Sequence, residues 1–137
     1  MKIYTAYLTL HTNKRKEIVP ITDDVGRIIR ESGVKEGIAL VSSMHTTASV
    51  IVNEEEAGLY RDMMEWVEQA APINPGYHHH LAGDDNGDAH LKSLLLHYQV
   101  ILPITNEQID LGPWQRVFYC EFDGQRSKSV IVKVMGE

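Results

Sequence analysis

The sequence predicts an α+β fold: a single domain over residues 1–137 in which a mainly antiparallel sheet packs with helices. The length of 137 residues is close to the common size of one domain. A hydrophobic content of 43% and a charged content of 23% are ordinary for globular chains and exclude collagen-like, fibrous and disordered classes. The predicted elements run strand, helix, two strands, two helices and then mostly strands, which favours antiparallel pairing.

The first third of the chain contains two strand patterns and one helix pattern. Residues 2–11 alternate in the period of a half-buried strand, and a short second strand follows over residues 17–21. Residues 23–32 are expected to form a helix with Thr22 and the following aspartates at its N-terminus and Gly33 just after its C-terminus. Three apolar side chains fall on one face of that helix: Val25, Ile28 and Ile29.

The middle of the chain begins with two short apolar runs, residues 38–42 and 49–52, which predict buried strands with His45-Thr46-Thr47 between them. Asn53, followed by Glu56, resembles a capping pattern and predicts a helix over residues 54–70 that Pro72 ends. The expected buried face of this helix is Ala57, Tyr60, Met64 and Val67.

The second half begins with residues 73–87, which lack periodicity and are rich in turn formers, so an irregular loop is expected there. Long ordered loops in compact domains are usually functional. A helix over residues 88–96 and a strand over 100–102 follow. Two further strands, residues 116–122 and 129–135, flank Asp123-Gly124, which predicts a hairpin.

Charge and hydropathy exclude several classes of function. Thirteen basic and nineteen acidic residues give a net charge of −6, which argues against general nucleic-acid binding. No apolar run approaches the about 20 residues of a membrane span, and the N-terminus lacks the apolar stretch of a signal peptide. We therefore expect a soluble cytoplasmic protein with no membrane partner. Cys120 is the only cysteine, so no internal disulfide can form.

Histidines are the strongest chemical signal. Four of the seven lie between Tyr77 and residue 90, beside several aspartates. Imidazole is the commonest metal ligand, and three protein ligands with an open position make the usual catalytic zinc site. The spacing matches no tight metal motif, so a solvated loop remains the alternative for residues 78–80. His90, in the first turn of a helix, and His45, at the end of a buried strand, are candidates on rigid elements; a hydrogen-bonded core histidine is the alternative for His45.

A second cluster lies near the C-terminus. Arg126 and Lys128 are expected at a hairpin tip, where they could clamp a phosphate with help from Ser127; a solvated turn is the alternative. Gln115, after Gly112-Pro113-Trp114, is a further candidate phosphate-binding residue. The sequence contains no glycine-rich phosphate loop, dinucleotide fingerprint or nucleophile elbow.

Four segments occur together in an order that resembles the YjbQ family, also called the secondary thiamine-phosphate synthase family. They are His45-Thr46-Thr47-Ala48-Ser49-Val50-Ile51-Val52-Asn53-Glu54, Asp84-Asp85-Asn86-Gly87-Asp88-Ala89-His90-Leu91-Lys92-Ser93, Gly112-Pro113-Trp114-Gln115-Arg116 and Glu121-Phe122-Asp123-Gly124-Gln125-Arg126. The likeness runs over nearly the whole chain.

The resemblance implies a homotrimer with a histidine-containing cleft and a weak thiamine-phosphate synthase activity. It places His45 and His90 in family motifs and sets the family's Tyr-x-His pattern on Tyr77 and His79, with His78 and His80 leaving that register open. Where the family commonly has Asp-Gly-Pro-Arg-x-Arg, this chain ends the motif with Lys128, which keeps the charge but loses the bidentate fork of arginine. Gly112-Pro113-Trp114 likewise replaces the commoner Gly-Thr-Trp.

The leading hypothesis from the sequence is a metal-dependent enzyme acting on a small phosphorylated substrate. His45, His79 and His90 would bind a divalent ion, zinc being favoured by histidine ligands, with manganese, nickel or iron as alternatives. In the same hypothesis Asp85 would orient a histidine or act as a general base, and Asn86 would fix the loop. The rival hypothesis is a non-catalytic trimer that binds a metal or a phosphorylated metabolite, and a third is that the histidines only pack at a trimer interface.

Overall fold

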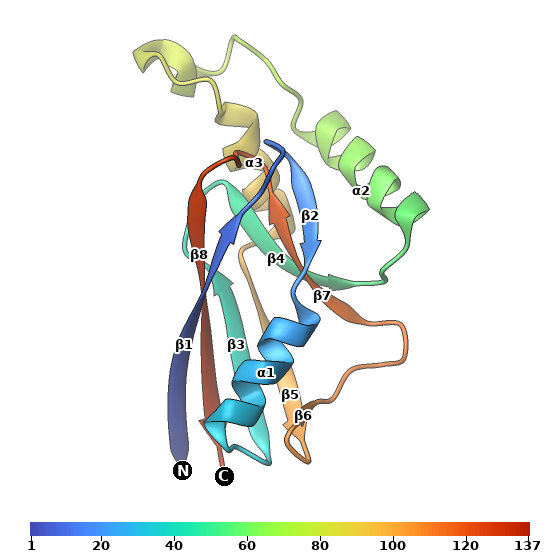
Figure 1. Ribbon diagram of the computed structural model, residues 1–137. Helices are drawn as coiled ribbons and strands as arrows, with labels where there is room; N and C mark the ends of the chain where they lie inside the picture. Colours follow the sequence, from blue (N-terminus) through green and yellow to red (C-terminus); the bar gives the residue numbers. More distant parts are fainter.

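The computed structural model describes residues 1–137 as two antiparallel sheets with three α-helices and a short 3₁₀ helix (Figure 1). The larger sheet has the strand order β1-β8-β3-β5-β6, and the smaller has β2-β7-β4. The strands are β1 (Lys2–His11), β2 (Glu17–Pro20), β3 (Gly37–Ser43), β4 (Ala48–Asn53), β5 (Gln99–Thr105), β6 (Gln108–Ile109), β7 (Arg116–Glu121) and β8 (Ser127–Gly136). The helices are α1 (Thr22–Ser32), α2 (Ala57–Ala70), η1 (His78–Ala82) and α3 (Gly87–Leu96).

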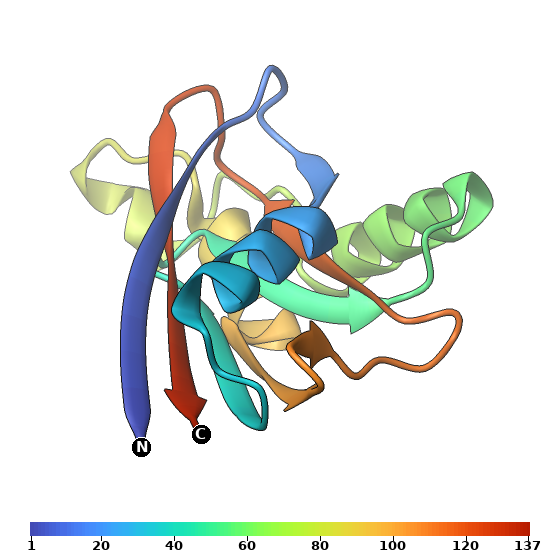
Figure 2. The ribbon, with the colours of Figure 1, turned by 60° about the horizontal axis from the view of Figure 1, so that its bottom comes forward.

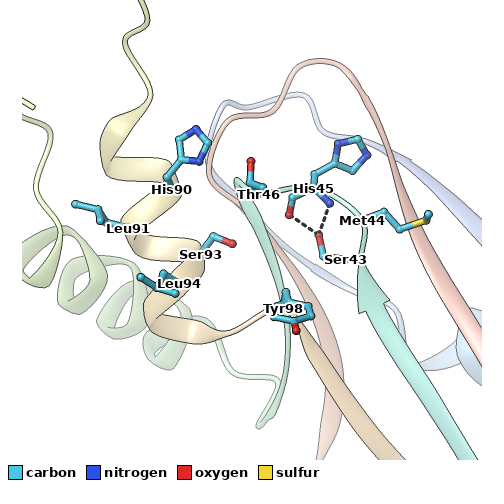
Figure 3. A pocket seen from close by; sticks show the side chains of 9 residues that line it. All are labelled: Ser43, Met44, His45, Thr46, His90, Leu91, Ser93, Leu94 and Tyr98. Atoms are coloured by element: carbon cyan, nitrogen blue, oxygen red, sulfur yellow. Dashed lines mark hydrogen bonds between the residues drawn. The ribbon is translucent and has the colours of Figure 1, made fainter. Parts of the chain in front are cut away.

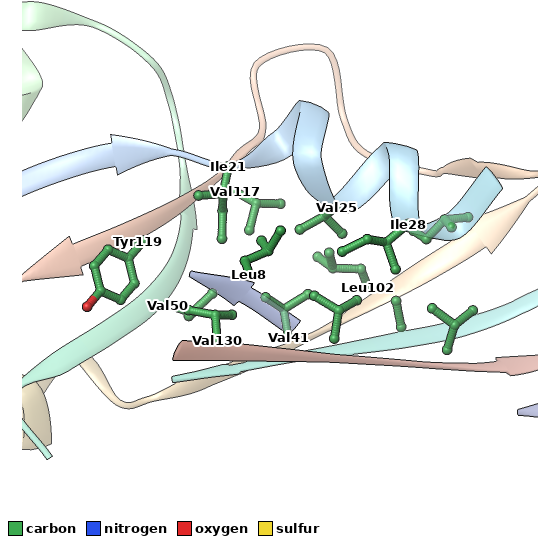
Figure 4. Close-up of a cluster of buried hydrophobic side chains, with 14 of the residues drawn as sticks. Leu8, Ile21, Val25, Ile28, Val41, Val50, Leu102, Val117, Tyr119 and Val130 are labelled. Atoms are coloured by element: carbon green, nitrogen blue, oxygen red, sulfur yellow. The ribbon is translucent and has the colours of Figure 1, made fainter. Parts of the chain in front are cut away.

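The main core lies between α1 and the inner faces of both sheets (Figures 2 and 4). The predicted apolar face of α1 is fully buried there, and Leu8 meets it from β1. Burying a side chain of this size stabilises a fold by about 1.5–3 kcal/mol. Gly33 ends α1 in the left-handed conformation, with φ of 72°, as its position after the helix predicts.

A second, smaller core fills the other face of the smaller sheet. Val67 of α2 and Ala89 of α3 pack there against alternate side chains of β7 and the residue after it, namely Phe118, Cys120 and Phe122. The intervening residues Val117 and Tyr119 belong to the main core. β7 is therefore buried on both faces, which explains why residues 117–120 are apolar with little alternation.

The predicted hairpin around Asp123-Gly124 is wrong. β7 pairs with β2 and β4, whereas β8 pairs with β1 and β3, so the two strands belong to different sheets. Gly124 lies against Thr12 and the carbonyl of Lys14, and a Cβ at this position would overlap both. Its amide also donates to the Arg15 carbonyl at 2.8 Å. The glycine thus permits a close crossing past the β1–β2 turn, and is not there to serve a hairpin turn.

The helix predicted over residues 54–70 begins later, at Ala57. The Glu56 carboxylate caps the helix by accepting hydrogen bonds from the amides of Gly58 and Leu59. Asn53 instead ends β4, and its side chain accepts a hydrogen bond from the Glu54 amide. Only Val67 of the expected buried face is fully buried, and Ala57 is exposed, because α2 projects from the body of the molecule (Figure 1).

Other differences are confined to the connections. The expected irregular loop over residues 73–87 contains η1, the strand expected over residues 100–102 extends over all of β5, and β6 had no signal in the sequence. The N-terminal cap expected from Thr22 is absent, because its hydroxyl bonds the backbone of Val117. None of the helices has the length and apolarity that a membrane span needs.

Candidate functional site

A cavity of about 520 Å³, here called the histidine cleft, opens between the β3–β4 turn and α3 (Figure 3). His45 and Thr46 come from the turn and His90 from the facing helix. The cleft is lined by Ser43, Met44, His45, Thr46, His90, Leu91, Ser93, Leu94 and Tyr98. Its volume is in the range of small-molecule sites, and its mixture of apolar walls and a few polar groups is typical of them.

His45 is held by hydrogen bonds that also fix its tautomer. The amide of Ser129 donates to its Nε2 at 3.0 Å, so in the neutral ring the proton lies on Nδ1. The Ser43 hydroxyl accepts from the His45 amide and donates to the His45 carbonyl. Burial, followed by the positive charges of Lys128 and Arg126, lowers the pKa of His45 below its ordinary value. The ring is therefore neutral near pH 7 and offers a hydrogen-bond donor.

A buried ion pair lies beneath this turn. The Lys128 ammonium is 2.6 Å from the Glu121 carboxylate and donates to the Thr47 hydroxyl at 2.7 Å, and both charged side chains are at most 1% exposed. Tyr119 donates to the same carboxylate at 2.7 Å, and its burial raises the pKa of the phenol. The position expected for Lys128, an exposed hairpin tip, is thus wrong: its charge is neutralised inside the protein.

His90 is positioned by the attachment of α3 to β4. The Ser93 hydroxyl donates to the Ala48 carbonyl at 2.8 Å, and the Ser49 hydroxyl donates to the Ser93 carbonyl at 3.1 Å. These reciprocal bonds hold the helix one turn after His90. Burial, and secondarily the nearby His79, lowers the pKa of His90, which keeps this imidazole neutral as well.

A second buried ion pair ties α3 to α2 and was not expected from the sequence. The Lys92 ammonium is 2.7 Å from the Asp88 carboxylate and 3.1 Å from that of Glu68, and it donates to the Ala71 carbonyl. Lys16 contacts the same two carboxylates from the β1–β2 turn. The four-residue spacing of Asp88 and Lys92 on a helix was the available signal for this pair.

The three consecutive histidines have different surroundings. The His79 ring lies edge-on to the His90 ring, with centroids 4.5 Å apart, and its Nε2 is 3.0 Å from Asn86 Oδ1. His80 Nε2 accepts from the Gly87 amide at 2.9 Å and so satisfies an N–H at the start of α3. The side chain of His78 is exposed. Of the three, His79 is therefore the one whose ring contacts His90.

A second cavity, of about 360 Å³, is also bordered by His90 and is lined by His79. Its lining residues are Tyr77, His78, His79, Gly87, His90 and Leu91. His90 therefore borders both cavities, whereas His45 borders only the histidine cleft and His79 only the second cavity.

The carboxylates and cations beside the loop are paired with one another. Asp85, expected to serve a histidine, instead faces Arg15 in a two-point contact at 3.1 and 3.3 Å. The carboxylate close to His79 is that of Asp84, at 3.9 Å. Arg126 contacts Asp123 at 3.2 Å but remains 59% exposed, and its charge acts on His45. Arg126 is thus the predicted phosphate-binding cation that is accessible beside the cleft.

Gln115 is separated from this region. Its Oε1 accepts from the Gly112 amide in the loop before β7, whereas Arg126 follows the opposite end of that strand. Six residues of β7 extend over about 17 Å at about 3.3 Å per residue. Within one chain the structure does not bring Gln115 together with the other candidates.

The donor arrangement within the chain does not fit the expected metal site. No group of three or more histidine, cysteine, aspartate or glutamate side chains is arranged to hold a metal ion. His45 Nε2 is engaged by the Ser129 amide, and the His79 and His90 rings provide two imidazoles without a third ligand. A three-histidine centre made of His45, His79 and His90 would require rearrangement of the side chains.

Comparison with known proteins agrees with this fold. A family model described as UPF0047 protein YjbQ-like matches residues 6–137. A UPF0047 protein of Archaeoglobus fulgidus is 44% identical over 93% of this chain and 98% of its own length, and one of Methanothermobacter thermautotrophicus is 37% identical over 100% and 95%. The crystal structure of a YbjQ-like protein of unknown function from Sulfolobus solfataricus aligns with a TM-score of 0.94 at 33% identity, over 99% of both chains. The chain belongs to the YjbQ-like UPF0047 family.

Proposed function

We propose that this YjbQ-like chain is an enzyme that acts on a small phosphorylated substrate bound in the histidine cleft. The observation that carries the proposal is the pair of imidazoles, His45 and His90, which face one cavity from separate elements and have lowered pKa values. Perturbed titratable groups in a cavity are typical of functional sites.

The surroundings of each group suggest its part. The imidazole of His90 makes no hydrogen bond to another side chain and is neutral near pH 7, so it can accept a proton from water or a substrate hydroxyl. His45 would donate its Nδ1–H to a phosphoryl oxygen, because its Nε2 is occupied. Arg126 would neutralise the phosphate, exchanging part of its contact with Asp123 for a bidentate pair. The weak thiamine-phosphate synthesis implied by the family resemblance is the specific reaction to assay first.

The proposed mechanism assigns no step to a metal ion, because the donors present do not form a three-ligand site. Metal content has its own test: elemental analysis of untagged protein purified without chelators, beside His79→Ala and His90→Ala variants. Near one zinc, manganese, nickel or iron per chain, lost in both variants, would restore the metal-dependent form of the proposal. No bound metal after addition of zinc or manganese would remove it.

A non-catalytic binding protein is the second candidate, and one observation favours it. Neither His45 nor His90 is hydrogen-bonded to a carboxylate, which is the usual orienting partner of a catalytic imidazole. A cleft of this kind could hold a phosphorylated metabolite without converting it.

The homotrimer remains part of the proposal, and the outer face of the larger sheet supports an oligomer. Ile3, Met135 and Ile38 form one row across β1, β8 and β3. Tyr7 and Ile101 extend this uncovered apolar face and are 61% and 64% exposed. Such a patch on a monomer would be unusual. Sedimentation of the wild type and of Ile3→Lys would test it: a trimer converted to monomer supports this face as the interface, and a monomeric wild type rejects it.

The function itself is tested by assaying phosphate or pyrophosphate release from a panel of small phosphate esters and pyrophosphates, with and without divalent metal. We expect turnover that falls about 100-fold or more in His90→Gln. The matched control is His11→Gln, which changes an exposed histidine at the end of β1. Calorimetric binding without turnover would favour the second candidate, and unchanged turnover in His90→Gln would remove His90 from the mechanism.

A further inference from the structure

The Asp123 carboxylate, in the link between β7 and β8, contacts donors from three segments. Its Oδ2 accepts from Asn86 Nδ2 at 2.9 Å and contacts Arg126 at 3.2 Å, and its Oδ1 is 3.4 Å from Arg15 Nε. Its amide donates to the buried Glu121 carboxylate at 3.1 Å, and its side chain is 19% exposed. The carboxylate is therefore held in place from both sides.

The contact with Asp123 determines the orientation of the Asn86 amide. An ionised carboxylate only accepts hydrogen bonds, so the atom of Asn86 that faces it must be the NH₂ group. The carbonyl oxygen of Asn86 then faces the other way, toward His79 Nε2 at 3.0 Å. The reverse orientation would set the amide oxygen against the carboxylate and leave two repelling acceptors.

The orientation of Asn86 in turn determines which nitrogen of His79 carries the proton. The carbonyl oxygen is an acceptor, so Nε2 must be the protonated nitrogen of the neutral ring. The Asp84 carboxylate, 3.9 Å from Nε2, is also an acceptor. Nδ1 is left with its lone pair, on a ring in edge contact with His90.

We propose that Asp123 is a positioning residue that acts through Asn86 to hold His79 in the Nε2–H tautomer, so that Nδ1 is the basic nitrogen of a ring in contact with His90. The inference deepens the proposed function, on which it rests for its use in the site, by naming the nitrogen that would accept a proton or contact a ligand in the second cavity. Its test reads a tautomer and needs no turnover, so the two proposals can fail separately.

The test is long-range ¹H–¹⁵N correlation NMR of the full-length protein about two pH units above the ordinary histidine pKa of about 6.5, where the rings are neutral. The wild type should show His79 predominantly as Nε2–H. In Asp123→Asn the constraint is lost, because an amide can present either a donor or an acceptor to Asn86, and comparable populations of both tautomers are expected. Asn86→Ala removes the transmitting group and should have the same effect.

Asp85→Asn is the matched control, since it removes a neighbouring charge from the same network of arginines without touching Asn86. The His79 tautomer should not change in this variant. A wild-type His79 protonated on Nδ1 would overturn the inference, and so would an Asp123→Asn variant that keeps the wild-type tautomer. If Asp123→Asn does not fold, Asn86→Ala is sufficient for the test: the inference is overturned if His79 remains Nε2–H in that variant.

Discussion

His45 and His79 border the two cavities that share His90, and the protein holds them in different ways. The turn that carries His45 rests on the fully buried Lys128–Glu121 pair and on the Ser129 backbone. The 3₁₀ helix that carries His79 is linked by an exposed hydrogen bond from His79 to Asn86, and Asn86 in turn by a partly buried one to Asp123. On the first side, geometry and stability depend on the same contacts. On the His79 side, we expect that side chains of the site can be replaced with little loss of folding stability.

The largest effect is expected from breaking the support of the first side. Lys128→Met leaves the buried Glu121 carboxylate without its positive counter-charge, although Tyr119 still donates to it, so we expect the free energy of unfolding to fall by about 3–5 kcal/mol, measured by urea denaturation. Lys35→Met, at an exposed lysine in the turn before β3, is the matched control and should change little. A loss below about 1 kcal/mol in Lys128→Met would show that the turn does not depend on this pair.

A smaller effect is expected where α3 joins β4. Ser93→Ala removes the hydrogen bond to the Ala48 carbonyl and leaves that buried acceptor unpaired, at a cost of about 1–3 kcal/mol. The same denaturation experiment measures it, with Ser127→Ala at an exposed position as the control. Faster amide exchange of residues 89–93 in Ser93→Ala would accompany the loss. Unchanged exchange would mean that packing alone holds His90.

Acidification should destabilise the cleft through its two histidines. The folded-state pKa values of His45 and His90 are below the unfolded value, so the unfolded chain binds protons first as the pH falls through about 6.5. Stability is therefore expected to decrease from this pH downward until the folded-state pKa values are passed. The slope of unfolding free energy against pH above about 5 should be smaller in a His45→Gln, His90→Gln double variant. An equal slope would contradict the neutral state of the rings.

The smallest effect is expected on the exposed side. Asp85→Asn breaks the contact with Arg15, but the aspartate side chain is 80% exposed, and such surface pairs contribute about 0–1 kcal/mol. We expect unchanged stability within that range and unchanged turnover of any substrate found. A loss of turnover would return Asp85 to the catalytic role considered from the sequence and would weaken the contrast between the two sides.

The sequence predicted the elements better than their partners. Local periodicity was sufficient for β1 and α1, whereas the Asp-Gly pair at Gly124 wrongly predicted a hairpin. It did not reveal that this glycine lies at a crossing between sheets, because hairpins and crossings require similar local residues. Ala57 was misplaced for a related reason: an apolar stripe shows which face of a helix could be buried, not how far the neighbouring core extends.

The candidate site divides in the same way. The sequence by itself determined the family and the antiparallel α+β architecture, and it proposed His45, His79 and His90 as candidate site residues, because motifs and periodicity are properties of short segments. Only the tertiary structure decided that Lys128 is buried with Glu121, that Asp85 pairs with Arg15 and that Gln115 lies at the far end of β7. Charge partners, burial and tautomers depend on residues that are distant along the chain, and no local pattern encodes them.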